Sequence, residues 1–506
     1  MKLRDRTVLV LGLGLSGLAM ARWCAAQGAA LRVADSRQQP PQLDALRQQL
    51  PHAAVHLGAA GEELLAGVDL VCVSPGIAPT GGAFGGLLDA ARARGIHRLG
   101  ELGLFAAALR QLRAERNYQP AVLGVTGTNG KTTVTALTQH LLAGAGIDAV
   151  AAGNIGPTML DMLSARMDQQ RLPQAWVLEL SSFQLHGCGD FAASAASVLN
   201  LSQDHLDWHG DMAAYASDKA NIFGPQPWTL TPAPGLMLLN RDDAAVLQLA
   251  RPGRALQTFG LNPPQRVGDW GVVQENGMAW LAWAQPDETE APPKRRSKLS
   301  GEPVPTPFQL KLLMPADALR IQGRHNWANA LAALALASST GVGLAPLLHA
   351  LRSYRGEPHR MQSLGVIAGV EWIEDSKGTN VGATAAALAG LERPVLLIAG
   401  GDGKGQDFAP LAAAARGRVK VALLIGRDAP VLAQALHGSV AVESCPSLEA
   451  AVARAAELAR AGDVVLLSPA CASMDMFSDY AHRAAVFAAA VQELALQQGV
   501  VLEGFA

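Results

Sequence analysis

The sequence predicts an α/β protein of three domains with mainly parallel sheets. The chain has 506 residues, about three times the usual length of one domain. Short apolar segments rich in β-branched residues alternate with helical stretches over most of this length, which is typical of parallel sheets. Loops rich in glycine or polar residues follow many of these segments. Ligands of α/β proteins bind at this end of the strands.

The composition argues against several classes of partner and site. Hydrophobic residues make up 49% of the chain and charged residues 17%, which provides for large cores. The net charge of −2 gives no reason to expect nucleic acid or a membrane surface as a partner. No apolar run approaches the ~20 residues that a membrane span needs. The five cysteines are scattered without a CxxC or Cys/His spacing, which predicts a cytoplasmic protein without disulfides or a zinc site.

The first domain is expected over residues 1–115 and to be Rossmann-like. Its strands are predicted at Val8–Leu11, Leu31–Ala34 and Leu70–Val73. The segment Gly12–Gly17, GLGLSG, fits the GxGxxG pattern, and Asp35 ends the second strand. Taken alone, these features are typical of an NAD-binding unit. The glycine turn selects only for a pyrophosphate at a helix N-terminus, and Asp35 selects for a ribose-like hydroxyl or a base edge. A UDP-sugar therefore fits as well.

Two further segments need an interpretation: the end of the third predicted strand and the border with the next domain. Ser74-Pro75-Gly76 ends the third predicted strand. On spacing alone we interpret it as a plain turn, with a place in the same ligand site as the alternative. The polar stretch Arg110–Gln119 is predicted to be the first linker, and the central domain is expected over residues 116–356.

The central domain opens on a phosphate-binding sequence, AVLGVTGTNGKTT, at Ala121–Thr133. An apolar strand, a glycine loop and a helical pattern follow one another. Glycines let backbone N–H groups close on phosphate oxygens, and the helix N-terminus adds partial positive charge. We expect Lys131 to reach the β- and γ-phosphates and the Thr132 hydroxyl to bind Mg²⁺. The strict motif has glycine where this chain has Val125, so the sequence predicts a variant P-loop in a P-loop ATPase-like domain.

Three polar residues further along are candidates for the same site. Glu179 lies near the end of the predicted strand Trp176–Leu180, where a buried carboxylate needs a cation or hydrogen-bond donors. Mg²⁺ is the natural partner, and a water-facing Glu on an edge strand is the alternative. His205 follows the predicted strand Ser197–Leu201 and is either a metal ligand or a loop histidine. Lys219 lies in a helical stretch and, on local grounds, is interpreted as a solvated surface charge.

An insertion is predicted at residues 285–306. This segment, QPDETEAPPKRRSKLSGEPVPT, is rich in proline and mixes acidic and basic residues, which is typical of a disordered surface loop. Its flanks, Gly271–Ala284 and Phe308–Leu313, have the pattern of paired strands.

The last domain, residues 357–506, is expected to be Rossmann-like again. Its strands are predicted around Val370–Ile373, Val395–Ile398, Val421–Ile425 and Val464–Leu467. Polar loops follow three of them, at Glu374–Asn380, Gly400–Lys404 and Ser468–Ser473. Loops after successive parallel strands face one edge of a sheet, so they predict a second half of an active site.

Six motifs, taken in order, resemble those of the Mur ligases, the ATP-dependent amide-forming enzymes of peptidoglycan precursor synthesis. They are GTNGKTT (127–133), GRHNWAN (323–329), HR (359–360), DSKGTN (375–380), GGDGK (400–404) and SPACASMD (468–475). Together with GLGLSG, Asp35 and Arg37, they look like the D-glutamate-adding branch of the family. The resemblance covers nearly the whole chain except 285–306.

The resemblance implies an activity and its cofactors. It implies ATP-dependent addition of D-glutamate to UDP-N-acetylmuramoyl-L-alanine through an acyl phosphate. The enzyme would be a cytoplasmic monomer that takes these small-molecule substrates and has two Mg²⁺ sites. It also implies that Lys219 is carbamylated, which would turn a cation into a carboxylate-like ligand.

The resemblance also assigns roles to individual residues. The UDP substrate is expected to contact Leu15, Ser16, Asp35, Arg37, Ser74, Gly76, Asn154 and Gln184. ATP is expected to bind Gly127, Thr128, Asn129, Gly130, Lys131, Thr132, Thr133, Asn326, Asn329, His359, Arg360 and Asp375. The incoming amino acid is expected to bind Lys377, Thr379, Lys404, Ser473 and Tyr480. The metal ligands are expected to be Thr132, Glu179, His205 and Lys219, and the catalytic residues Lys131, His205 and Lys219.

Three other functions are weighed against this one. An NAD(P)-dependent oxidoreductase would account for GLGLSG and Asp35 but leaves GTNGKTT unexplained. A P-loop kinase or regulatory NTPase leaves the three C-terminal polar loops unexplained. A sibling Mur ligase or a folylpolyglutamate synthase-like ligase would add another amino acid or act on a folate, and Asp35 with Arg37 favours a UDP-sugar over a folate.

Overall fold

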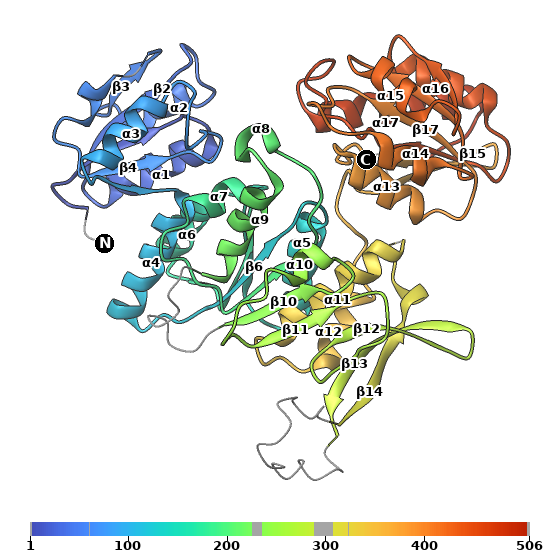
Figure 1. Cartoon of the computed structure of the whole chain (residues 1–506), viewed down its shortest axis with the longest axis horizontal. Helices are drawn as coiled ribbons and strands as arrows, with labels where there is room; N and C mark the ends of the chain where they lie inside the picture. The colour runs from blue at the N-terminus through green and yellow to red at the C-terminus, as the bar shows by residue number, and fades with distance from the viewer. Residues whose placement is uncertain (1–2, 60, 225–234, 288–306, 322, 503–506) are drawn as a thin grey trace.

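The chain folds into three α/β domains that follow one another along the sequence. The computed structural model describes residues 3–59, 61–224, 235–287, 307–321 and 323–502. Each domain is built around its own sheet, of five, nine and six strands. In Figure 1 the N-terminal and C-terminal domains lie on either side above the central one. This confirms the predicted fold class.

The N-terminal sheet is entirely parallel, with strand order β3-β2-β1-β4-β5. Its strands are β1 (Thr7–Leu11), β2 (Ala30–Asp35), β3 (Ala54–Leu57), β4 (Leu70–Val73) and β5 (His97–Leu99). Its helices are α1 (Leu15–Ala26), α2 (Leu43–Gln49) and α3 (Gly85–Ala93), with a 3₁₀ turn at Glu62–Leu65. The run TVLVL is buried on both faces of β1, as a central parallel strand requires.

A continuous helix, not a polar linker, leaves this domain. Helix α4 (Glu101–Arg116) includes most of the predicted linker Arg110–Gln119, so that prediction is wrong for residues 110–116. The polar side chains lie on its exposed face while Leu112 is buried, and Asn117, in the left-handed region at φ 52°, ends it. Phe105 packs edge-on against Trp176 of the central domain, with ring centroids 5.1 Å apart.

The central sheet is parallel at its heart and antiparallel at one end. Its order is β14-β13-β12-β11-β10-β9-β6-β8-β7, and only β12–β13 and β13–β14 pair antiparallel. The strands are β6 (Ala121–Thr126), β7 (Ala149–Gly153), β8 (Ala175–Glu179), β9 (Ala195–Val198), β10 (Leu236–Asn240), β11 (Leu256–Phe259), β12 (Trp270–Glu275), β13 (Met278–Pro286) and β14 (Phe308–Pro315). The phosphate-loop strand β6 therefore lies in the interior of the sheet.

Several helices pack on this sheet, and α5 begins at the phosphate loop. They are α5 (Lys131–Gly144), α6 (Met159–Asp168), α7 (Ser182–His186), α8 (Leu206–His209), α9 (Met212–Ala220), α10 (Ala244–Leu247), α11 (Arg324–Ser338) and α12 (Leu344–Leu351), with 3₁₀ turns at Asn221–Phe223 and Ala316–Ala318. The helices α5, α11 and α12 pack together over one face, and the alanine-rich run of α11 is almost fully buried there.

The flanks of the predicted insertion pair as expected. β13 and β14 are antiparallel neighbours, which confirms that the segment between them interrupts a β structure. β13 extends to Pro286, so residues 285 and 286 belong to a strand and not to a disordered loop. Residues 288–306 lie outside the described part of the chain.

The C-terminal sheet has the order β15-β16-β20-β17-β18-β19, with only β15 antiparallel. Its strands are β15 (Gln362–Ile367), β16 (Val370–Glu374), β17 (Val395–Gly400), β18 (Val419–Ile425), β19 (Ala441–Ser444) and β20 (Val464–Leu467). Its helices are α13 (Val381–Ala389), α14 (Ala409–Ala415), α15 (Ala429–Leu436), α16 (Leu448–Leu458) and α17 (Tyr480–Gln497). The three polar loops follow the adjacent parallel strands β16, β20 and β17, which confirms that they share one edge.

Candidate active site

A large cavity between the N-terminal and central domains gathers the predicted UDP-substrate residues. Its volume is about 660 Å³, within the range of small-molecule sites. All eight predicted residues line it: Leu15, Ser16, Asp35, Arg37, Ser74, Gly76, Asn154 and Gln184. The first six come from the N-terminal domain, and the last two, Asn154 after β7 and Gln184 in α7, come from the central domain. The two domains therefore form this site together.

The glycine turn packs as a pyrophosphate-binding turn does. Gly12 has φ +83°, and a Cβ atom on Gly17 would meet the Gly12 carbonyl oxygen at 1.9 Å. A Cβ on Gly14 would meet nothing within 4 Å, which leaves space beside the N-terminus of α1. The Ser74 hydroxyl donates to the Gly12 carbonyl at 2.8 Å. Ser74 thus packs against the glycine turn and lines the same cavity, which favours the alternative of a place in the ligand site over a plain turn.

Asp35 is held as a carboxylate by Arg37. The guanidinium of Arg37 donates to both carboxylate oxygens at 2.8 and 2.7 Å, and the Leu13 N–H donates to one of them at 2.7 Å. Burial raises the pKa of Asp35, but these hydrogen bonds outweigh it and lower the pKa to about 2. Asp35 is therefore an ionised acceptor at the edge of the cavity.

The phosphate loop brings two lysines onto one carbonyl group. Lys131, the first residue of α5, donates to the carbonyl oxygens of Gly127 and Thr128 at 2.9 and 2.8 Å. Lys219 of α9 donates to the same Gly127 oxygen at 2.9 Å. Gly130 has φ +83°, which lets the loop turn into the helix without strain. Two amines therefore meet beneath the loop.

Lys219 is a buried residue and not the solvated surface charge that local sequence suggested. Its side chain is 1% exposed, and its amine lies 4.5 Å from the centre of the Tyr215 ring. Burial, reinforced by the charge of Lys131, lowers the pKa of Lys219 well below its usual value. The short helix α9 conceals this, because only the fold shows which of its faces is covered.

Within the described residues, the candidate metal ligands do not make a complete metal site on their own. Glu179 is buried at the end of the interior strand β8, which excludes the water-facing alternative, and it accepts a hydrogen bond from Asn154 at 3.0 Å. It lines a cavity of about 550 Å³ together with Thr132. Among the described residues, no three His, Cys, Asp or Glu side chains form a metal-binding group. The oxygens of Thr132 and Glu179 nevertheless suit Mg²⁺, which takes most of its ligands from phosphate and water.

His205 is placed near this loop by an unusual backbone conformation. It precedes α8 with φ 54°, packs edge-on against the Phe183 ring at 4.7 Å, and has Nε2 3.5 Å from Asp204 Oδ2. Burial lowers the pKa of His205, so its neutral form, the one that binds metals, is favoured.

The C-terminal domain reaches across to the phosphate loop. Arg360 donates to the Thr132 hydroxyl at 2.7 Å, and Asn380 donates to the Asn129 side chain at 3.0 Å. Between the two domains lies a cavity of only about 70 Å³, lined by the predicted ATP residues Asn129, Gly130, Thr133, Asn326, Asn329, Arg360 and Asp375. This is several times smaller than a typical ligand site.

Two adjacent carboxylates support the C-terminal side of this cavity. Glu374 is buried and accepts from His359 Nδ1 at 2.8 Å and from the Ser376 N–H at 2.6 Å. Asp375 accepts from the Ser468 hydroxyl at 2.7 Å. Burial raises the pKa of Asp375 to about 7 in spite of that hydrogen bond.

The residues predicted to bind the incoming amino acid lie on three loops and, for Tyr480, at the start of α17. Contacts join these segments to one another. Lys377 contacts Tyr480, with its amine 3.4 Å from the hydroxyl and 4.8 Å from the ring centre. Burial lowers the pKa of Lys377 to about 8. The loops of Lys404 and Ser473 meet in an isolated bridge between Asp402 and Ala472. Thr379 lies two residues after Lys377, in the same loop.

Sequence reasoning missed the arginine that joins these loops. Arg483 is fully buried and donates to the Ser376 hydroxyl, the Ser376 carbonyl and the Cys471 carbonyl at 3.0, 2.8 and 3.1 Å. It lies within an ordinary helical sequence in α17, so no local signal distinguishes it. A fully buried guanidinium whose donors are satisfied fixes the two loops relative to each other.

A second missed group lies beneath the metal side of the site. His209 bridges Asp218 and Ser182, with ring nitrogens 2.9 Å from Asp218 Oδ2 and 2.9 Å from the Ser182 hydroxyl. Asp218 also binds His186 at 3.0 Å. Because Ser182 begins α7 and Asp218 precedes Lys219 on α9, this chain fixes the two helices relative to each other.

The raised pKa of Asp375 leads to a pH-dependent prediction. An acid whose pKa is higher in the folded state contributes stability that is full below its unfolded pKa of 3.8 and is lost as the pH rises to about 7. Asp375→Asn removes this titration. The wild-type free energy of unfolding, relative to that of the variant, should therefore fall by roughly 2 kcal/mol between pH 5 and pH 7. Urea unfolding at both pH values measures the difference, with Asp44→Asn at an exposed position of α2 as the control. A difference that does not change with pH would contradict the analysis.

Comparisons with known proteins identify related chains over the whole length. Three family models match in order: the MurD-like N-terminal domain of Mur ligases at residues 6–100, the Mur ligase middle domain at 125–337 and the Mur ligase glutamate ligase domain at 359–471. The chain is 53% identical over 504 residues to UDP-N-acetylmuramoylalanine--D-glutamate ligase of Cupriavidus pinatubonensis, covering 99% of each chain. It is 54% identical over 520 aligned positions to the protein of that name in Albidiferax ferrireducens, covering 100% of this chain and 99% of the relative.

Solved structures of low sequence identity share the fold. The MurF ligase of Thermotoga maritima in complex with ADP has a TM-score of 0.57 at 15% identity, covering 98% of this chain and 97% of its own. UDP-N-acetylmuramate-alanine ligase MurC of Thermotoga maritima has a TM-score of 0.53 at 17% identity, covering 96% of this chain and 99% of its own. The family models, the full-length relatives and the shared fold agree: the chain belongs to the Mur ligase family.

Proposed function

We propose that this chain joins the amine of D-glutamate to the L-alanyl carboxylate of UDP-N-acetylmuramoyl-L-alanine, with conversion of ATP to ADP and phosphate. The observation that carries the proposal is the pair of contacts that joins the C-terminal domain to the phosphate loop: Arg360 to Thr132, and Asn380 of the first polar loop to Asn129. The UDP-substrate cavity reaches the central domain at Asn154 and Gln184. An acceptor, a phosphate donor and an amine can meet only at such a junction.

The names of the full-length relatives support this choice of substrates. The reaction belongs to peptidoglycan precursor synthesis. We place it in the cytoplasm, and no helix among the described residues is long and apolar enough to span a membrane. A monomer is part of the proposal as the working form. The domain boundaries near residues 115 and 356 likewise remain part of the proposal.

The chemistry requires cations between two anions. A carboxylate oxygen attacks the γ-phosphorus of ATP, the bond to ADP breaks, and an acyl phosphate forms. Lys131 and Arg360 are placed to neutralise the approaching carboxylate and phosphate. The hydroxyl of Thr132 and the carboxylate of Glu179 would hold Mg²⁺, which when bound withdraws charge from the phosphate oxygens.

The second half-reaction uses the C-terminal loops. The neutral amine of glutamate attacks the acyl carbon, phosphate leaves, and the nitrogen loses a proton as the amide forms. Glutamate carries two carboxylates, and Lys377, Lys404 and the hydroxyls of Thr379, Ser473 and Tyr480 provide cations and donors for them. The indirect link through Arg483 keeps two of these loops in register.

We also propose that Lys219 is carbamylated. A neutral amine attacks carbon dioxide, an N–C bond forms, one proton is released, and the product is an anion. The burial of Lys219 beside Lys131 supports this, because it favours the neutral amine before reaction and offers a cation to the carbamate afterwards. The carbamate and His205 would then complete a second metal site.

A substrate panel tests the proposed reaction. Release of ADP is measured with UDP-N-acetylmuramate, UDP-N-acetylmuramoyl-L-alanine and its D-glutamyl derivative, each with D-glutamate, L-glutamate, L-alanine or a diamino acid. ADP should appear only with UDP-N-acetylmuramoyl-L-alanine and D-glutamate together. Turnover confined to another acceptor would overturn the proposal, and ATP hydrolysis without an acceptor would favour a regulatory NTPase.

Replacing Lys131 tests whether ATP and the UDP substrate bind at different sites. Lys131→Ala should lower kcat by at least ~10²-fold, because a cation at the transferred phosphate is lost. The Kd of UDP-N-acetylmuramoyl-L-alanine should stay within about twofold, because that substrate contacts the other cavity. Calorimetry and steady-state kinetics measure both quantities. Lys420→Ala is the matched control, because Lys420 lies in β18 of the C-terminal domain and pairs with Asp463. Loss of UDP-substrate binding in Lys131→Ala would contradict the assignment of the cavities.

A spectroscopic experiment tests the carbamate. Wild-type protein equilibrated with ¹³C-bicarbonate should give a carbamate carbon resonance, and Lys219→Arg should lack it. Lys377→Arg is the matched control, because burial also lowers the pKa of Lys377, and this variant should keep the resonance. A resonance that survives in Lys219→Arg would exclude carbamylation of Lys219 as its source.

A further inference from the structure

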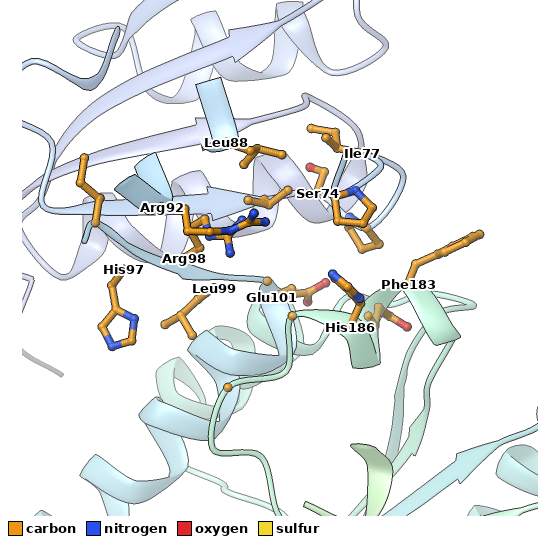
Figure 2. Close-up of a pocket in the computed structure, with 18 of the residues that line it drawn as sticks. Ser74, Ile77, Leu88, Arg92, His97, Arg98, Leu99, Glu101, Phe183 and His186 are labelled. Atoms are coloured by element: carbon orange, nitrogen blue, oxygen red, sulfur yellow. The ribbon is translucent and has the colours of Figure 1, made fainter. Parts of the chain in front are cut away.

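A second cavity between the N-terminal and central domains adjoins the UDP-substrate cavity. Its volume is about 430 Å³, and it lies behind the turn that begins at Ser74. Residues of that turn, together with Phe183 and Gln184, line both cavities and form their shared wall. Figure 2 shows Leu88 and Ile77 on one wall and Phe183 and His186 on the opposite one. The walls are therefore contributed by both domains.

Two arginines line this cavity, and Asp89 is the acid that interacts with both of them. Arg98 of β5 is half-buried, and within the described residues its guanidinium makes no hydrogen bond or ion pair. Arg92 of α3 lies close by and pairs with Asp89 at 3.3 Å. Burial lowers the pKa of Arg98, and the charge of Arg92 adds to this effect. A half-desolvated guanidinium beside a second one is the environment that an anion relieves.

A buried acid lines the same cavity. Glu101, the first residue of α4, is 1% exposed, and its Oε1 accepts from the Leu160 N–H at 3.1 Å. Burial raises the pKa of Glu101, which favours its neutral form. The acid therefore opposes the charge of the arginines less than an exposed carboxylate would.

The rest of the lining is apolar. Leu88, Ile96 and Leu99 lie on the N-terminal side, and Trp208 and Phe183 lie on the central side. Apolar walls with a few convergent polar groups are typical of small-molecule sites, and the volume falls within their range. A fully polar anion such as inorganic phosphate would leave these walls uncovered.

We infer that this cavity binds a small amphipathic anion, with its carboxylate or phosphate on Arg98 and Arg92 and its apolar body between Leu88 and Trp208. Because the two walls belong to different domains, such a ligand binds only when the N-terminal domain has the orientation seen here. The site is separate from the UDP-substrate and ATP sites, and the inference does not rest on the proposed function.

Calorimetry on the full chain tests the inference with 2-naphthoate as the probe. We expect saturable binding that is about tenfold tighter than binding of the neutral 2-naphthamide, and that persists in saturating UDP. Replacing 2-naphthoate with 2-naphthyl phosphate shows whether the site prefers a carboxylate or a phosphate. The absence of binding at millimolar probe, equal binding of the amide, or displacement by UDP would each overturn the inference.

Substitutions locate the probe in the cavity. Arg98→Gln should weaken 2-naphthoate binding about tenfold and abolish the preference over the amide, and Arg92→Gln should weaken it in the same direction. Arg47→Gln, at an exposed position of α2, is the matched control and should bind as the wild type does. Unchanged binding in both Arg98→Gln and Arg92→Gln would overturn the assignment, so the test survives if one of these variants does not fold.

Discussion

The active site depends on a single carbonyl group. The Gly127 oxygen accepts hydrogen bonds from both Lys131 and Lys219, so two buried amines lie beneath one turn of the phosphate loop. Burial lowers the pKa of both amines, and the charge of Lys131 lowers the pKa of Lys219 further. We propose that two anions offset this unfavourable charge. One is the phosphate group of a nucleotide above Lys131, and the other is the carbamate that replaces the amine of Lys219. The loop is therefore built for a charge that the protein alone does not supply.

Much of this architecture could be predicted from sequence. The glycine turn, the phosphate loop and the polar loops after β16, β17 and β20 each carry local signals, because glycine and polar residues at strand ends mark ligand sites in any parallel sheet. All eight UDP-substrate residues accordingly line one cavity. The motif resemblance assigned roles to residues such as Arg360 that local chemistry alone would have left open.

The failures have physical causes. The linker prediction at Arg110–Gln119 failed because a solvated helical face has the same composition as a linker. Lys219 was interpreted as exposed because burial of one helix face depends on tertiary packing. Arg483 and His209 act through contacts with residues far away in sequence, Ser376 and Ser182, and neither position has a local pattern. Contacts of this kind follow from the fold and not from the segment.

The state of the domains bears on how the reaction is protected from water. The UDP-substrate cavity is open at about 660 Å³, whereas the space between the phosphate loop and the C-terminal domain is about 70 Å³. The Arg360–Thr132 and Asn380–Asn129 contacts close that space. We propose that ATP binds in this space as the C-terminal domain closes, with Arg360 exchanging the Thr132 hydroxyl for a phosphate oxygen. The same closure that assembles the cations expels water, which would otherwise hydrolyse an acyl phosphate before the amine reaches it.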